Sequence, residues 1–283
     1  MRAARFSALL LLAALLTLAS AALAQRFGGG VRFQGHDDAP DPVFATGAEF
    51  HFIRTEYTDL PEFHRNFGYA SRSARGNGWW IVDWPDADNH FTSGVQRLTR
   101  IDAGDPRHLS LTDAHLFDYP WIYATQVGWW GLSEAEISRL REYLTRGGFL
   151  VVDDFWGPDP VQWQVFSRTM ARVLPNRPIT DIAPADSVMH VLYDITEKDR
   201  TFIPGTRHLR MGPGGNVIVQ QPFGTQPAWR AIYDEQNRMV VAINYNTDVG
   251  DAWEYADSPE YPERMTALAY RYGINYVIYA MTH

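Results

Sequence analysis

The sequence alternates between short apolar runs and longer segments in which apolar residues recur at helical spacing. Residues 79–82 and 149–152 are continuous apolar runs that end directly before an aspartate, as expected of buried parallel strands. Residues 133–146 instead carry apolar side chains at positions 137, 140 and 144, the spacing of one helix face. Since parallel strands are joined by crossover helices, this alternation predicts an α/β sandwich with a mostly parallel sheet.

Local signals place the expected elements. Ser133 and Glu136 form a capping box at the start of a helix, and Gly147 ends that helix. Pro120 is expected at the first position of its strand, where proline is tolerated, and the last helix can continue past Gly273. The expected strands are 48–53, 79–82, 119–127 and 149–152, the helices are 89–100, 133–146, 161–174 and 263–272, and an antiparallel hairpin joins 229–233 to 239–243.

Residues 1–24 have the pattern of a secretory signal peptide. Arg2 and Arg5 form a basic start, and the apolar run over residues 8–22 leads to a small-x-small pattern ending at Ala24. The alternative is a membrane anchor, but the run is shorter than the roughly 20 residues that span a bilayer. We therefore expect cleavage after Ala24 and export to the periplasm or the medium, with no transmembrane span in the mature chain.

The rest of the chain divides into a linker and a domain. Residues 25–46 are rich in glycine, proline and aspartate and lack apolar periodicity, so we expect a flexible linker. Residues 47–283 are long enough to bury about 70–75% of their unfolded surface. A single domain therefore accounts for them.

Composition excludes several kinds of chemistry. The chain has no cysteine, which removes a cysteine nucleophile, disulfides and thiolate metal sites. It also lacks a Gly-x-Ser-x-Gly elbow that would present a catalytic serine. The formal net charge of −8 argues against nucleic acid as the main partner, because phosphate binding needs clustered positive charge.

The expected sheet predicts where a ligand binds. In open α/β sheets ligands bind outside the carboxyl ends of the strands, and residues 83–90, 128–131 and 153–157 would follow three such ends. Residues 244–248 are a fourth candidate, less certainly at the same edge. The candidate ligand-binding residues are Arg54, Asp83, Asp86, Asp88, Trp129, Trp130, Asp153, Asp154 and Trp156.

Several spaced motifs occur in one order along the chain. They are Arg54 with Tyr57, Asp83-Trp84-Pro85 with Asp88, a Leu-Phe-x-Tyr-Pro segment at 116–120, the stretch from Leu140 to Asp154 with Gly147-Gly148, and Gly273-Ile274-Asn275. Over about residues 45–280 they resemble an uncharacterised bacterial family of exported or membrane-tethered domains of unknown function. That family is related to the class I glutamine-amidotransferase-like superfamily, which includes trehalose-utilisation-like proteins. The resemblance implies a flavodoxin-like three-layer sandwich and a cell-envelope context, without the amidotransferase cysteine.

The aspartates are open to three interpretations. Asp83, Asp86, Asp88, Asp153 and Asp154 offer the oxygen ligands that calcium and magnesium prefer, and two close carboxyls can instead share a proton and act as acid and base. In the structural alternative, Asp83 bonds turn amides, Asp88 caps the helix that starts at residue 89, and Asp153 braces a loop. Their spacing matches no calcium-loop signature, so the sequence assigns no metal or cofactor.

The other candidates also have two interpretations each. Trp129, Trp130 and Trp156 can line a groove that stacks on sugar rings, or bury their rings in the core. Arg54 can clamp an anionic group or pair with a rim aspartate. His90 can reach the aspartates near residue 83 or bond locally.

Two functions remain. The first is an exported cell-envelope binding or scaffold domain on a catalytically degenerate amidotransferase-like fold, with envelope proteins or glycans as partners. The second is a metal- or carboxylate-dependent hydrolase of envelope glycans, which needs two carboxyls about 5–10 Å apart around an open cleft. The missing nucleophile favours the binding domain.

Overall fold

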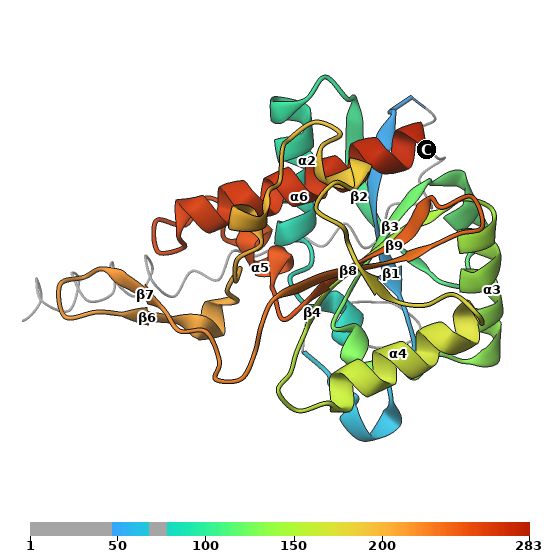
Figure 1. Cartoon of the computed structure of the whole chain (residues 1–283), viewed down its shortest axis with the longest axis horizontal. Coiled ribbons are helices and arrows are strands. Elements are labelled where there is room, and N and C mark those ends of the chain that lie inside the picture. The colour runs from blue at the N-terminus through green and yellow to red at the C-terminus, as the bar shows by residue number, and fades with distance from the viewer. Residues whose placement is uncertain (1–46, 68–77) are drawn as a thin grey trace, which may run out of the picture. The chain divides into compact units, whose positions relative to one another are not determined.

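The computed structural model describes residues 47–67 and 78–283 (Figure 1). The predicted signal peptide and linker, residues 1–46, lie outside the described residues. The main sheet has seven strands in the order β2-β1-β3-β4-β9-β8-β5. In that order they are Ala103–Ser110, Phe50–Glu56, Trp121–Thr125, Phe149–Phe155, Met239–Tyr245, Ala228–Tyr233 and Thr180–Asp181.

The sheet is mostly parallel, as the alternating sequence predicts. Strand β1 pairs in parallel with β2 and β3, β3 with β4, and β4 with β9. Strands β8 and β5 extend the sheet in antiparallel fashion, and β8 with β9 forms the expected hairpin. Counted along the chain, the parallel strands follow the order 2-1-3-4-5 of flavodoxin-like folds, so the expected architecture is confirmed.

Helices cover both faces of the sheet and make three layers (Figure 1). On β3, Trp121 and Tyr123 point into one core and Ile122 and Ala124 into the other, because side chains alternate along a strand. The first core contains residues of α2 (Asp86–Leu98), α5 (Val249–Glu254) and α6 (Glu263–Thr282). The second contains residues of α3 (Glu134–Thr145) and α4 (Val161–Val173).

The prediction of a strand over residues 79–82 is wrong. Residues Trp79–Ile81 form a short 3₁₀ turn, although Trp80 and Ile81 are buried as a strand would bury them. A short apolar run cannot distinguish a buried strand from a buried turn. The place in the sheet belongs to β2, whose polar sequence suits an edge strand and whose pairing with β1 shifts register around Pro106.

The remaining elements agree with the sequence apart from their ends. The capping box of Ser133 and Glu136 is present at the start of α3. Strand β3 begins directly after Pro120 rather than at it, and α2 begins at Asp86 rather than at residue 89. Helix α6 continues past Gly273, where a Cβ atom would lie 2.4 Å from the ring of Phe91. Glycine therefore lets α6 pack closely on α2.

A small two-stranded sheet lies outside the main one. Strands β6 (Leu209–Met211) and β7 (Val217–Val219) pair in antiparallel register and extend away from the sheet (Figure 1). Met211 and Ile218 on this hairpin are exposed. This hairpin is not among the elements predicted from the sequence.

Candidate functional site

The carboxyl ends of β1, β3, β4 and β9 share one edge of the sheet because these strands are parallel. Four non-glycine residues near this edge have left-handed backbone: Asp83 (φ 66°), Gln126 (φ 54°), Asp154 (φ 49°) and Asn246 (φ 58°). Such a conformation costs about 1–3 kcal/mol per residue and concentrates where a fold positions functional side chains. This edge is therefore the first place to look for a site.

Arg54 and Asp88 form a fully buried ion pair beneath the edge. Both side chains are 0% exposed, and Arg54 donates to Asp88 through Nε at 3.0 Å and Nη2 at 2.5 Å. Its Nη1 donates to the carbonyl oxygens of Trp80 and Val82. Burial alone would lower the pKa of Arg54, but attraction to Asp88 raises it above its ordinary value. Arg54 therefore pairs with an aspartate and fixes the turn before α2, and Asp88 lies inside α2 instead of capping it.

Asp153 is also held by internal contacts. Its Oδ2 accepts hydrogen bonds from the amides of Val249 (2.7 Å) and Gly250 (3.0 Å) and from the hydroxyl of Tyr123 (3.3 Å). Burial raises the pKa of Asp153, and the neighbouring Asp154 raises it further, whereas the amide bonds oppose the shift. Asp153 thus attaches α5 to the end of β4.

Asp154 makes a separate set of bonds. It accepts from Gln126 Nε2 and Trp156 Nε1, and its Oδ1 pairs with Arg207 Nη2 at 2.8 Å. Arg207 comes from the turn before β6, so this ion pair joins the base of the small hairpin to the sheet edge. The guanidinium of Arg207 also lies 4.7 Å from the ring centre of Trp156.

Four further carboxyl groups converge beside these two. One oxygen each of Asp83, Asp248 and Asp251 lie within 4.8 Å of one another, and Glu254 approaches Asp251 closely enough to hydrogen-bond with it. Asp248 and Asp251 are buried. Asp83 is one of the predicted site residues, and Asp248 is the last residue of the fourth candidate segment, residues 244–248. Asp83 enters from the turn before α2 instead of from the end of a strand.

The environment of this cluster favours protonation of its carboxyl groups. Burial raises the pKa of Asp83, Asp248 and Asp251 above the usual range, and repulsion among these carboxylates and from Asp154 adds to the shift. Burial and then the neighbouring Asp251 raise the pKa of Glu254 to about 8. Clustered negative charge of this kind requires protons or a cation to balance it.

Asp251 and Glu254 were missed, although the sequence held a signal that links them to Asp248. Asp248, Asp251 and Glu254 follow one another at intervals of three, which places them on one side of a helical turn. The segment over residues 249–254 is too short to be recognised by apolar periodicity. Arg207 carries no comparable signal, because only the tertiary fold brings it to the edge.

The tryptophans predicted as groove-lining candidates each contact a different set of aromatic residues. Trp130 is 2% exposed and packs on Tyr57 and Phe166, so its ring belongs to the core. Trp129 is half-buried and stacks on Trp79, with Phe63 beside it.

The remaining candidates near the edge are Trp156, Asp86 and His90. Trp156 contacts Phe202 and His208, in addition to Arg207. Asp86 is half-buried in the first turn of α2. His90 Nδ1 donates to the carbonyl oxygens of Trp253 and Glu254, so it braces the end of α5.

Comparison with known domain families gives one match. Residues 67–281 match a family described as a domain of unknown function, DUF4159. The chain belongs to this family. The matched DUF4159 region contains Asp83, Asp248 and Asp251 but begins after Arg54. No curated protein shows significant similarity to the chain.

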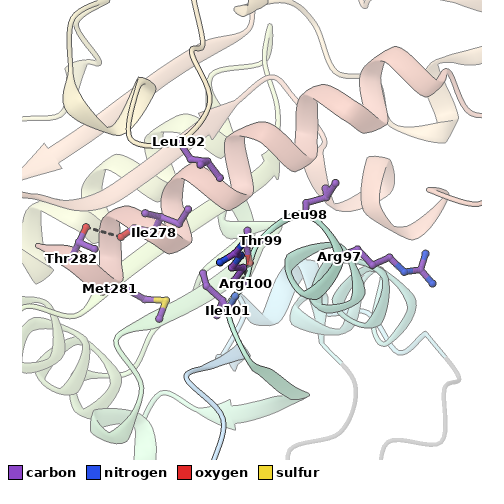
Figure 2. A pocket seen from close by; sticks show the side chains of 9 residues that line it. All are labelled: Arg97, Leu98, Thr99, Arg100, Ile101, Leu192, Ile278, Met281 and Thr282. Carbon is purple, nitrogen blue, oxygen red and sulfur yellow. Dashed lines mark hydrogen bonds between the residues drawn. The ribbon is translucent and has the colours of Figure 1, made fainter.

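In the surface of this DUF4159 domain, one hollow lies far from the carboxylates and another lies near them. One of about 700 Å³ lies where α2 ends and α6 ends, at the amino edge of the sheet, and Figure 2 shows its mainly apolar lining, including Leu98, Leu192 and Met281. Another, of about 310 Å³, lies between β6–β7 and the segment after α5, and Thr206 in its lining bonds to Asp251. In the ranges 47–67 and 78–283, no helix combines the length and apolarity needed to cross a membrane.

Proposed function

We propose that this chain is an exported domain of the bacterial cell envelope that binds an envelope component, with glycan as the class that best fits, and does not catalyse its conversion. The signal-peptide pattern of residues 1–24 supports export. The 2-1-3-4-5 strand order suits a relationship to the class I glutamine-amidotransferase-like superfamily. The absence of cysteine from the sequence removes the nucleophile of that superfamily.

The observation that carries the proposal is the use of Asp153 and Asp154 in internal bonds. Asp153 accepts from two amides of α5, and Asp154 is paired with Arg207. A general acid or base needs a side chain that can reach the substrate. These two carboxylates at the end of β4 instead hold neighbouring segments in place, which supports binding over hydrolysis.

The hollow beside β6–β7 supplies groups suited to a sugar. Tyr255 and Tyr261 stack with their ring centres 6.5 Å apart, and both line the hollow with Thr206 and Arg210. Aromatic rings pack on the apolar faces of sugars, while hydroxyl and guanidinium groups bond their oxygens. The hollow also borders the acidic cluster through the bond between Thr206 and Asp251.

A glycan hydrolase is the second candidate, and one observation favours it. Glu254 has a pKa of about 8 beside Asp251, so at neutral pH this pair can hold a proton as a general acid does. Asp251 would then be the group whose loss abolishes turnover.

One experiment separates the two candidates. The full chain is incubated with purified peptidoglycan sacculi, and both the protein in the pellet and the reducing ends in the supernatant are measured. Binding without release is the expected result, weakened by Arg210→Ala but not by the control Arg177→Ala, whose side chain pairs with Glu235. Release that Asp251→Asn abolishes would establish the hydrolase instead. Absence of both sedimentation and release would refute glycan as the ligand.

Export is tested separately. N-terminal sequencing of the protein recovered from the periplasm or medium of a bacterial host is expected to begin at Gln25. Retention of the intact chain in the membrane fraction would support the anchor interpretation and contradict cleavage.

A further inference from the structure

The acidic cluster contains buried oxygens that lack a partner. Asp83 Oδ2 and Asp248 Oδ2 are both inaccessible to solvent and accept no hydrogen bond from the described residues. The side chain of Asp248 is 1% exposed, and Arg207 Nη1, at 3.9 Å, is too far away to donate to it. A buried carboxylate oxygen without a donor is costly unless something else satisfies it.

Two glycines leave room for these oxygens. A Cβ atom on Gly205 would lie 2.4 Å from Asp248 Oδ2 and 3.0 Å from Asp251 Oδ2, so both oxygens approach the same point. A Cβ atom on Gly250 would lie 2.5 Å from Asp83 Oδ2. Larger side chains at either position would displace the carboxylates.

Backbone and side-chain bonds orient the carboxylates. Asp248 accepts the amide of Asp251 through Oδ1 at 2.9 Å, which leaves its Oδ2 directed elsewhere. Asp251 Oδ2 accepts from the amide and hydroxyl of Thr206. Asp83 is set by its left-handed backbone and by Arg54, which holds the carbonyl of Val82. Supporting bonds of this kind are typical of carboxylates that ligate metals.

We propose that Asp83, Asp248 and Asp251 bind one calcium ion. One oxygen of each carboxylate lies within 4.8 Å of the other two, so a single ion can contact all three. Carboxylate oxygens are the ligands that calcium prefers, and calcium tolerates flexible geometry better than magnesium does. Arg207 lies near Asp248 but is also paired with Asp154, so its single charge does not balance all of these carboxylates, and the ion supplies the remaining positive charge.

The site goes beyond the proposed function, because it would hold the ion whether or not the domain binds glycan. It lies at the carboxyl edge, one bond away from the hollow that Thr206 lines. The ion therefore stabilises α5 against the turn before α2 and fixes one wall of that hollow.

The test uses the full chain freed of metal with a chelator and titrated with calcium chloride in a calorimeter, with melting curves in parallel. We expect about one calcium per chain and a higher melting temperature with calcium. Asp248→Asn and Asp83→Asn each remove one repelling charge, so each is expected to raise the melting temperature of the metal-free protein. Each is also expected to lower calcium affinity at least about tenfold.

Asp181→Asn is the matched control, since Asp181 is exposed on β5 and pairs with Arg230; its calcium affinity should equal that of the unchanged chain. No heat and no melting shift with millimolar calcium would overturn the proposal, as would wild-type affinity in Asp248→Asn. If Asp248→Asn does not fold, Asp83→Asn decides. Tighter binding of magnesium than calcium would overturn the assignment of the ion. The calcium titration contains no glycan, so its result is independent of the sacculus experiment.

Discussion

Replacing Asp88 with asparagine would leave the guanidinium of Arg54 charged and without its counter-ion inside the protein. Both side chains are 0% exposed, and the pair is joined through two guanidinium nitrogens. Removing one partner of a buried pair costs about 3–5 kcal/mol, because the remaining charge stays desolvated. For a domain of this size that corresponds to a fall of about 6–20 °C in melting temperature.

The assay is urea and thermal unfolding followed by circular dichroism. Glu142→Gln is the control, since Glu142 pairs on the surface of α3 with Arg139 and Arg146, and its loss should change stability by no more than about 0.5 kcal/mol. The double variant Arg54→Met/Asp88→Leu removes both charges and should be more stable than either single variant.

A loss below about 1 kcal/mol in Asp88→Asn would refute this reasoning, because it would mean that water reaches Arg54 and solvates its charge. The same variant also tests how the turn before α2 is held. Since Arg54 bonds the carbonyl of Val82, Asp83 should shift in this variant and calcium affinity should fall.

Three further predictions concern the acidic cluster, the core and α3. Glu254 has a pKa of about 8 in the folded protein and about 4.3 when unfolded, so the metal-free protein should lose stability as pH rises from about 4.3 to about 8. His208, with a pKa lowered to about 4, opposes this trend only below about pH 6.5. Urea unfolding between about pH 6.5 and 8 should therefore show the slope. Glu254→Gln should make it shallower without removing it, because Asp83, Asp248 and Asp251 also have raised pKa values; an equal slope in both proteins would contradict the assignment. Trp130→Ala should lower the free energy of unfolding by about 3–5 kcal/mol, as measured by urea unfolding. Trp129→Ala should lower it by clearly less, because that ring is half-buried. Equal losses in the two variants would place both rings in the core. Ser133→Ala should cost about 1 kcal/mol through loss of the cap on α3, and an unchanged midpoint would show that Glu136 caps the helix alone.

The sequence was sufficient for the central strands of the sheet but not for its edge strands. Strands β3, β4 and β9 are buried on both faces, so their apolar runs are continuous and recognisable. Strand β2 covers an edge with residues such as Gly104 and Pro106, which predict a turn as readily as a strand.

The site was predictable in position and only partly in its residues. The rule that ligands bind at carboxyl ends led to Asp153 and Asp154, but the roles of these residues depend on partners about 50 to 100 positions away in the chain, such as Arg207 and Gly250. No local pattern reveals such pairings. Asp83 was selected because a strand was expected before it, and it reaches the edge by a 3₁₀ turn instead.

The alternation of β3 between two dry cores has a consequence for strand register. A slip of one residue would exchange Trp121 and Tyr123 with Ile122 and Ala124 across the sheet, so both cores would be filled with side chains of the wrong size at once. In a sheet with one solvent-exposed face, such a slip is penalised only by the apolar groups that it exposes on that side. Here the slip would disrupt the packing against both helical layers. Each of the two cores therefore fixes the alignment of β3 with its neighbours.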